Sequence, residues 1–333
     1  MLVKKLDILL ITRGILALSV ILWHVEGYKE NIWALFNLPG RTAVILFFGM
    51  SGFVISHGFI FEKYSFMKTD LKIFYIRRLL RIMPLFLLIS LTTLLYQYFF
   101  HGQWLLSFNQ ILPEIFMTQF NHSYQLNSVF WTLGIEMQFY LIVPLIIYFT
   151  IYSLKNLTGQ LFFYFFLIGI YLIQAYFYGP DIRNILGNFM HFYSGILSCW
   201  YIKKNGVPKI SNLYVGLIIA IIFFLSNYLY HHSIVGYFTL GYLMIHLSVP
   251  AIIILHYNLI KSQLIDKLNL ISYFLTFGTI SYGIYAWHPF VIKLTNEHYN
   301  SNLILVLISS ITIAYISYYL FEKPILSYVK KKK

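Results

Sequence analysis

Residues 9–25 read LLITRGILALSVILWHV, an apolar stretch that contains two basic side chains, Arg13 and His24. The stretch is long enough to enter a bilayer as a helix. A strong base and an imidazole are costly in lipid, and they are retained there mainly where they are paired, hydrated or used. A helix turns by roughly 100° per residue, so the two side chains share one face, about 16 Å apart along the axis. The first helix is therefore expected to carry a cation at one depth and a proton-transfer group at another.

The composition predicts an all-α polytopic membrane protein. The mean hydropathy is +0.72, 59% of residues are hydrophobic and 11% are charged, against about 25% charged residues in a soluble domain. Aromatic residues make up 20% of the chain, which is typical of belts at the two bilayer interfaces. With Cys199 as the single cysteine, disulfides, zinc fingers and a CxxC redox site are excluded.

Apolar runs of about 20 residues predict membrane spans. About ten are expected, at 8–28, 42–61, 79–99, 128–152, 161–178, 184–202, 211–230, 236–257, 270–293 and 302–322. No small-residue cleavage site follows the first, which is expected to be a retained span rather than a signal peptide. The less apolar stretch 103–127 is expected to be a long outer loop with an interfacial helix, or a re-entrant segment.

The distribution of charge predicts the orientation. With both termini in the cytoplasm, 19 of the 24 lysines and arginines fall on the inner side and four on the outer side, while Arg13 lies within a span. This bias follows the positive-inside rule, so the net charge of +13 reports topology and does not indicate a nucleic-acid partner. No internal repeat is found, which disfavours the secondary transporters that are built from repeats.

Three arginines, Arg77, Arg78 and Arg81, lie where the third span leaves the cytoplasm. Residues three and four apart are neighbours on a helix, so the three form one cluster. Guanidinium groups bind phosphate with bidentate geometry, which favours a site for a phosphorylated cytosolic cofactor. A positive-inside anchor that contacts anionic lipid remains the alternative.

The fourth expected span opens with WTLGIEMQFY, residues 131–140, and places Glu136 deep in the membrane. A carboxylate there is usually functional or ion-paired, so Glu136 is a group that orients a histidine or binds an acceptor, or else a structural partner of Arg13. Tyr140 lies one turn further on the same face.

The ninth expected span contains SYGIYAWHP, residues 281–289, with Tyr282, Tyr285 and His288. These are either packing and interface residues or acceptor contacts, with His288 expected near the outer end. Gly49 and Gly52, which flank Ser51, allow close helix approach. The spacing of the remaining histidines does not match a metal-binding motif.

Together these stretches resemble the membrane acyltransferase-3 family. The matching segments are LDILLITRGILALSVILWH (6–24, with arginine, ten residues and histidine), FFGMSGFVIS (47–56), YIRRLLRIMPLF (75–86), WTLGIEMQFYLIVP (131–144), SYGIYAWHP (281–289) and FEKP (321–324). They occur in order over nearly the whole chain. The segment between Asp7 and Arg13 is longer than the family usually has, which leaves any role for Asp7 open.

The resemblance implies a stand-alone membrane O-acyltransferase, with one domain over residues 1–325 and a basic cytoplasmic tail over 326–333. It would move an acyl group, acetyl or in some members succinyl, from cytosolic acyl-CoA to a hydroxyl of a surface polysaccharide, lipopolysaccharide or exopolysaccharide, in the cytoplasmic (inner) membrane of a bacterium. Acetyl-CoA would be a co-substrate, with no metal, and membrane lipids would surround the chain.

The residues expected to take part fall into three groups. They are His24, Glu136 and Arg13 for catalysis; Arg13, Arg77, Arg78 and Arg81 for CoA; and Trp131, Tyr140, Tyr282, Tyr285 and His288 for the acceptor. His24 would act as general base, oriented by Glu136, or would carry the acyl group covalently. A flippase or transporter of a lipid-linked sugar is the alternative from another class, and a catalytically inactive interaction or sensor protein is a third.

Overall fold

The computed structural model describes residues 7–26, 40–61, 63–102, 108–116, 126–179, 182–231, 241–261, 270–299 and 302–330. Over these residues the chain is helical and contains no strand. The helices are α1 (Ile8–Glu26), α2 (Gly40–Ile60), α3 (Lys68–His101), α4 (Phe108–Ile115), α5 (Phe130–Tyr152), α6 (Leu157–Tyr178), α7 (Ile185–Asn205), α8 (Asn212–His231), α10 (Ser248–Lys261), α11 (Leu270–Thr279), α12 (Ser281–Tyr299), α13 (Leu303–Ser317), the π-helical segment η2 (Tyr318–Glu322) and α14 (Lys323–Lys330).

Eight helical segments of the described chain are long and apolar enough to cross a membrane, fewer than the ten expected from the sequence. The run 184–202 forms α7, which is long enough but less apolar than the others. The run 270–293 is divided at Ile280 into α11 and α12, so neither piece meets both criteria. Within the stretch 103–127, the short helix α4 forms at Phe108–Ile115, and much of the remainder lies outside the described residues.

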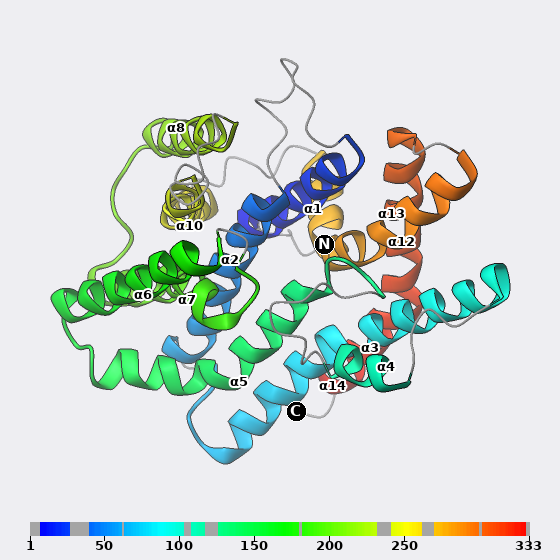
Figure 1. Ribbon diagram of the computed structural model, residues 1–333. Helices are drawn as coiled ribbons and strands as arrows, with labels where there is room; N and C mark the ends of the chain where they lie inside the picture. Colours follow the sequence, from blue (N-terminus) through cyan, green and yellow to red (C-terminus); the bar gives the residue numbers. More distant parts are fainter. Residues whose placement is uncertain are drawn as a thin grey trace.

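Helix α1 lies in the middle of the molecule, with α8 and α10 on one side and α12 and α13 on the other (Figure 1). It contacts α2, α10, α11, α12 and α13. Its approach to α11 depends on two glycines, because a Cβ on Gly278 would fall 2.0 Å from the carbonyl oxygen of Leu10 and one on Gly14 would fall 2.9 Å from the backbone nitrogen of Gly278. This close crossing fixes the N-terminal half of α1, which carries Arg13.

The closest helix pair is α2 with α7, and glycine again makes it possible. A Cβ on Gly52 would fall 2.0 Å from the carbonyl oxygen of Phe192, and one on Gly195 would fall 2.0 Å from that of Gly49. The structure therefore confirms the close helix approach predicted for Gly49 and Gly52, whereas Ser51 between them points elsewhere. Small residues at such crossings are typical of helix pairs in membranes.

The ends of several helices are specified locally. Asn156, Asn184 and Asn302 cap α6, α7 and α13 by accepting hydrogen bonds from backbone N–H groups of the first turn, as asparagine commonly does. Helix α3 ends at Gly102, whose φ of 71° suits glycine. Helix α3 begins at Lys68, about three turns before the start of the membrane run predicted at 79–99, so the arginine cluster lies within one continuous helix.

Candidate active site

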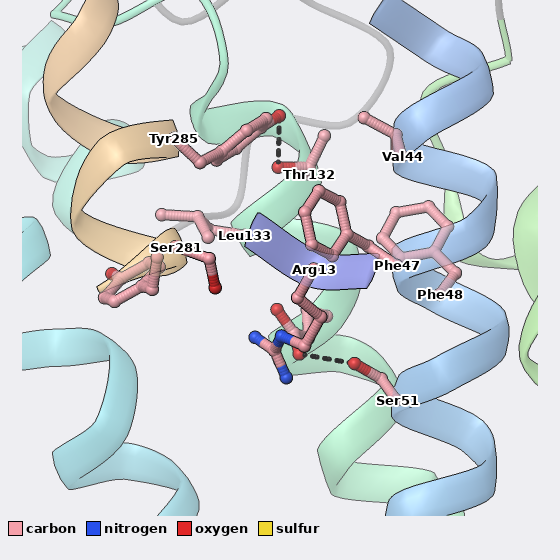
Figure 2. A pocket seen from close by; sticks show the side chains of 11 residues that line it. Arg13, Val44, Phe47, Phe48, Ser51, Thr132, Leu133, Ser281 and Tyr285 are labelled. Atoms are coloured by element: carbon pink, nitrogen blue, oxygen red, sulfur yellow. Dashed lines mark hydrogen bonds between the residues drawn. The ribbon is translucent and has the colours of Figure 1, made fainter. Parts of the chain in front are cut away.

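A small cavity of about 40 Å³ lies against the N-terminal half of α1, at Arg13. Side chains from four helices line it: Arg13 of α1, Val44, Phe47, Phe48 and Ser51 of α2, Thr132, Leu133 and Glu136 of α5, and Ser281, Tyr282 and Tyr285 of α12. Figure 2 shows Tyr285 and Thr132 at one end of this cavity and the guanidinium of Arg13 with Ser51 at the other. Residues from four separate segments of the resemblance thus meet at one place.

Glu136 is held in this cavity by two hydroxyl groups. The hydroxyl of Ser51 donates a hydrogen bond of 3.1 Å to Oε1 of Glu136, and the hydroxyl of Tyr140 donates a short one to the same atom. Arg13 is half-buried with its Nε enclosed, and it interacts electrostatically with Glu136, and also with Arg81 and Arg78. The guanidinium of Arg13 therefore interacts with one carboxyl group and with two further guanidinium groups.

The three arginines of α3 line a larger cavity of about 660 Å³. Two lysines from other parts of the chain, Lys63 and Lys323, lie in the same wall, and Tyr64, Tyr318 and Ser327 add hydroxyl groups. Arg77 donates a hydrogen bond of 3.1 Å to the hydroxyl of Tyr64. The cavity is strongly basic and large enough for a small-molecule ligand.

The guanidinium of Arg78 lies between aromatic rings, 5.5 Å from the ring of Phe74 and 5.4 Å from that of Tyr140. Tyr140 in turn donates to Glu136. Contacts through Arg78, Tyr140 and Glu136 thus connect the basic cavity to the Arg13 cavity. Arg13 also interacts electrostatically with Arg78 and Arg81.

His24 lies at the other end of α1, against His288 of α12. The two ring centroids are 4.9 Å apart. Nδ1 of His24 lies 2.9 Å from the carbonyl oxygen of Val20, and Nδ1 of His288 lies 2.6 Å from that of Tyr285. A carbonyl can only accept, so both Nδ1 atoms must carry the proton, which leaves Nε2 of each neutral ring as a lone-pair acceptor.

The surroundings of the two histidines differ. His288 is fully buried, and its Nε2 has no hydrogen-bond partner. His24 is exposed and lines a separate cavity of about 350 Å³. Buried imidazole nitrogens without a partner are uncommon in proteins and mark His288 as a residue to explain.

The structure brings together most of the residues singled out from the sequence, although in pairs that differ from those expected. Glu136 bonds with Ser51 and Tyr140, and His24 bonds with Val20 and contacts His288; the two do not meet. Tyr282 and Tyr285 line the Arg13 cavity. The hydroxyl of Tyr285 lies 3.0 Å from that of Thr132.

Trp131 lies away from the histidines, between two cations. Its ring is 5.4 Å from the guanidinium carbon of Arg41 and 5.5 Å from that of Arg183. Sequence reasoning missed Lys63 and Lys323 as parts of the basic wall, because their positions become relevant only once α14 and the α2–α3 connection are placed beside α3. Within the described residues, no group of three or more histidine, cysteine, aspartate or glutamate side chains could hold a metal ion.

Three cavities therefore follow one another along α1. Leu10 lines the basic cavity, Arg13 lines the small cavity and His24 lines the third. The distance along the helix from Leu10 to His24 is about 21 Å at 1.5 Å per residue. A ligand extended along α1 would pass from the guanidinium groups to the imidazole.

Comparison with known proteins identifies relatives over nearly the whole chain. The O-acetyltransferase OatA of Staphylococcus aureus is 25% identical over 94% of this chain and 56% of its own length. The peptidoglycan O-acetyltransferase OatA of Listeria monocytogenes is 28% identical over 94% of this chain and 55% of its own length. The chain thus spans a little over half the length of these relatives. No solved structure matches it.

The family model described as an acyltransferase domain, of the acyltransferase-3 type, matches residues 6–322. The match includes α1 with Arg13 and His24, the arginine cluster of α3, Glu136 of α5 and His288 of α12. The chain therefore belongs to the acyltransferase-3 family.

Proposed function

We propose that this protein is a membrane-bound O-acyltransferase that moves an acyl group, acetyl in the simplest case, from acyl-CoA to a hydroxyl group of an envelope glycan. The observation that carries the proposal is the succession of three cavities along α1, with guanidinium groups at one end and an imidazole at the other. The relatives named as O-acetyltransferases support the same reaction, and the Listeria relative is named for peptidoglycan.

The basic cavity would hold the phosphates of the donor. Arg77, Arg78 and Arg81, with Lys63 and Lys323, supply cations from three parts of the chain, and charge-assisted hydrogen bonds to phosphate are among the strong ones in proteins. A cluster that served only as a lipid anchor would not need to enclose a cavity. The thin pantetheine arm would then extend along α1 toward Arg13.

The Arg13 cavity is the narrow point of this path. Its volume of about 40 Å³ has room for about three water molecules, each needing about 10–15 Å³. The arm can pass only if side chains such as Phe47 or Tyr282 move, so this cavity would control access of the thioester to His24. Arg13 and Glu136 would form its charged wall, with Glu136 positioning Arg13 rather than His24.

The reaction itself would take place at His24. Nε2 of the neutral ring accepts the proton of the acceptor hydroxyl as its oxygen attacks the thioester carbonyl. A new C–O ester bond forms, the C–S bond breaks, and the proton passes from the imidazolium to the leaving CoA thiolate. His288 would support the imidazolium of His24, because its ring centroid lies 4.9 Å from that of His24 and its Nε2 has no hydrogen-bond partner. A general base of this kind contributes about 10²–10⁴-fold in rate.

The same proposal includes the topology. Both termini lie in the cytoplasm, so the basic cavity opens toward cytosolic acyl-CoA and His24 lies toward the outer face of the cytoplasmic membrane of a bacterium. Residues 1–325 form one domain, and residues 326–333 continue it as a basic tail. The positive-inside bias of lysine and arginine supports this orientation.

The test is transfer of label from [¹⁴C]acetyl-CoA to envelope glycan in membranes that contain or lack the chain. Chain-dependent label in an alkali-labile ester on glycan is the expected result. Export of glycan without labelling would instead favour a flippase, and absence of both would favour a non-catalytic protein.

A further inference from the structure

The cavity at His24 has a wall that neither the reaction chemistry nor the sequence motifs account for. Besides His24 it is lined by Ser128, Pro289, Ile292, Lys293, Asn296 and Glu297. Five of these come from α12, at positions that follow one helical face over more than two turns. All of them except Pro289 lie outside the SYGIYAWHP segment, so this wall was not predicted as a site.

The carboxyl group of Glu297 in this wall is held by two neighbouring side chains. The hydroxyl of Tyr96 donates a hydrogen bond of 2.5 Å to Oε2 of Glu297, and Nε2 of His101 lies 3.5 Å from the same oxygen. The Tyr96 hydrogen bond lowers the pKa of the Glu297 carboxyl, so the group is a carboxylate at neutral pH. Lys293, one turn earlier, places a cation beside this anion.

The chemical character of the wall favours an uncharged polar ligand. The lysine and the carboxylate offset each other, while Asn296 and Ser128 can both donate and accept. Pro289 and Ile292 give an apolar patch between these groups, as needed for the C–H face of a sugar ring. The volume of about 350 Å³ is near the lower end of the range of about 300–1,000 Å³ for small-molecule sites, which suits one sugar unit rather than several.

We infer that this cavity is the acceptor subsite, which binds one uncharged hexose or N-acetylhexosamine unit of the glycan through Ser128, Lys293, Asn296 and Glu297 and directs its hydroxyl to Nε2 of His24. The inference rests on the proposed function and assigns the acceptor to residues other than the aromatic set expected from the sequence. Donor and acceptor then approach from opposite ends of α1.

Chemical closure of the cavity tests this assignment. Asn296→Cys and Ser128→Cys place thiols on two walls that come from different segments, and the native Cys199 is buried. A small charged methanethiosulfonate reagent would then add a sulfonate inside the cavity. Ile304→Cys is the control, because this side chain is 66% exposed at the start of neighbouring α13 and does not line the cavity.

Transfer from [¹⁴C]acetyl-CoA to the cells' own glycan is measured in permeabilised membranes. Mass spectrometry determines what fraction of the introduced cysteine has reacted with the reagent. The reagent should lower transfer about 10²-fold or more in the two cavity variants, since a misplacement of 1 Å is enough for such a loss. It should leave transfer by Ile304→Cys unchanged, and dithiothreitol should restore activity. The affinity of purified, labelled protein for CoA, measured by calorimetry, should not change.

Two results would overturn the assignment. One is full labelling of Asn296→Cys or Ser128→Cys with undiminished transfer. The other is a parallel loss of CoA affinity, which would mean that the reagent distorts the protein rather than blocks the acceptor. Failure of the unmodified protein to transfer label is a different outcome, since it refutes the proposed function itself.

Discussion

Replacement of Glu136 by glutamine tests whether the carboxylate serves Arg13 or His24. The change keeps the size of the side chain and removes its charge. In the structure Glu136 accepts from Ser51 and Tyr140 and interacts with Arg13, whose other charged neighbours include Arg81. Glu136→Gln would therefore leave a half-buried guanidinium whose remaining charged neighbours are Arg81 and Arg78.

The size of the effect follows from this geometry. Removing one partner of a fully buried pair typically costs about 3–5 kcal/mol, and the half-buried Arg13 and Glu136 should lose less, about 1–3 kcal/mol. At about 2 °C per kcal/mol for a chain of this size, the melting temperature should fall by about 2–6 °C. Transfer should fall as well, since Arg13 loses its fixed position.

The assay is thermal unfolding of purified protein in detergent, followed beside acyl transfer. A double variant, Arg13→Gln with Glu136→Gln, removes both charges and should regain much of the lost stability, although it should stay inactive. Gln138→Leu on the same helix is the control, because Oε1 of Gln138 is buried without a partner and its loss should not destabilise. A Glu136→Gln protein that is inactive but unfolds at the wild-type temperature would refute this reasoning and return Glu136 to a direct catalytic role.

Three other substitutions test separate parts of the site and the fold. His24→Ala should reduce transfer by about 10²–10⁴-fold with normal membrane level and CoA affinity, and near wild-type acylation by a well-expressed variant would exclude it as the base. Arg78→Ala should weaken CoA binding roughly ten- to hundredfold, because a charge-assisted hydrogen bond contributes about 1.5–3 kcal/mol. Calorimetry with CoA and dephospho-CoA measures this loss, with Lys72→Ala as the control. Equal affinity in all variants would support the lipid-anchor alternative. Gly52→Leu should prevent accumulation of folded protein, because its Cβ would fall 2.0 Å from the carbonyl oxygen of Phe192; a stable variant of normal melting temperature would contradict the α2–α7 crossing.

The sequence correctly predicted which side chains share a face of one helix, because this depends only on helical periodicity. Tyr140 was expected on the face of Glu136, and the two side chains are hydrogen-bonded. Arg77, Arg78 and Arg81 were expected to form one cluster, and they line one cavity. Such relations follow from about 3.6 residues per turn and need no knowledge of neighbouring helices.

The sequence did not predict which helices contact one another. The expectation that Glu136 orients His24 required their two helices to be neighbours and to bring these side chains to one depth. In the structure Glu136 lies at the level of Arg13, and His24 meets His288 instead. Which helices are neighbours depends on close crossings such as Gly278 on Leu10, and a hydropathy pattern does not encode them.

The division of the run 270–293 at Ile280 shows how such a crossing affects the site. Gly278 lies at the end of α11, where it allows contact with α1, and α12 begins at Ser281 in a new helix. The break separates α11, which packs against α1 near Arg13, from α12, which carries Tyr282, Tyr285 and His288. Because α12 then continues past His288 to Glu297, one helix lines both the Arg13 cavity and the cavity at His24. A single unbroken span in this position would have one direction throughout, whereas the break lets α11 follow α1 closely and lets α12 carry polar groups to two separate cavities.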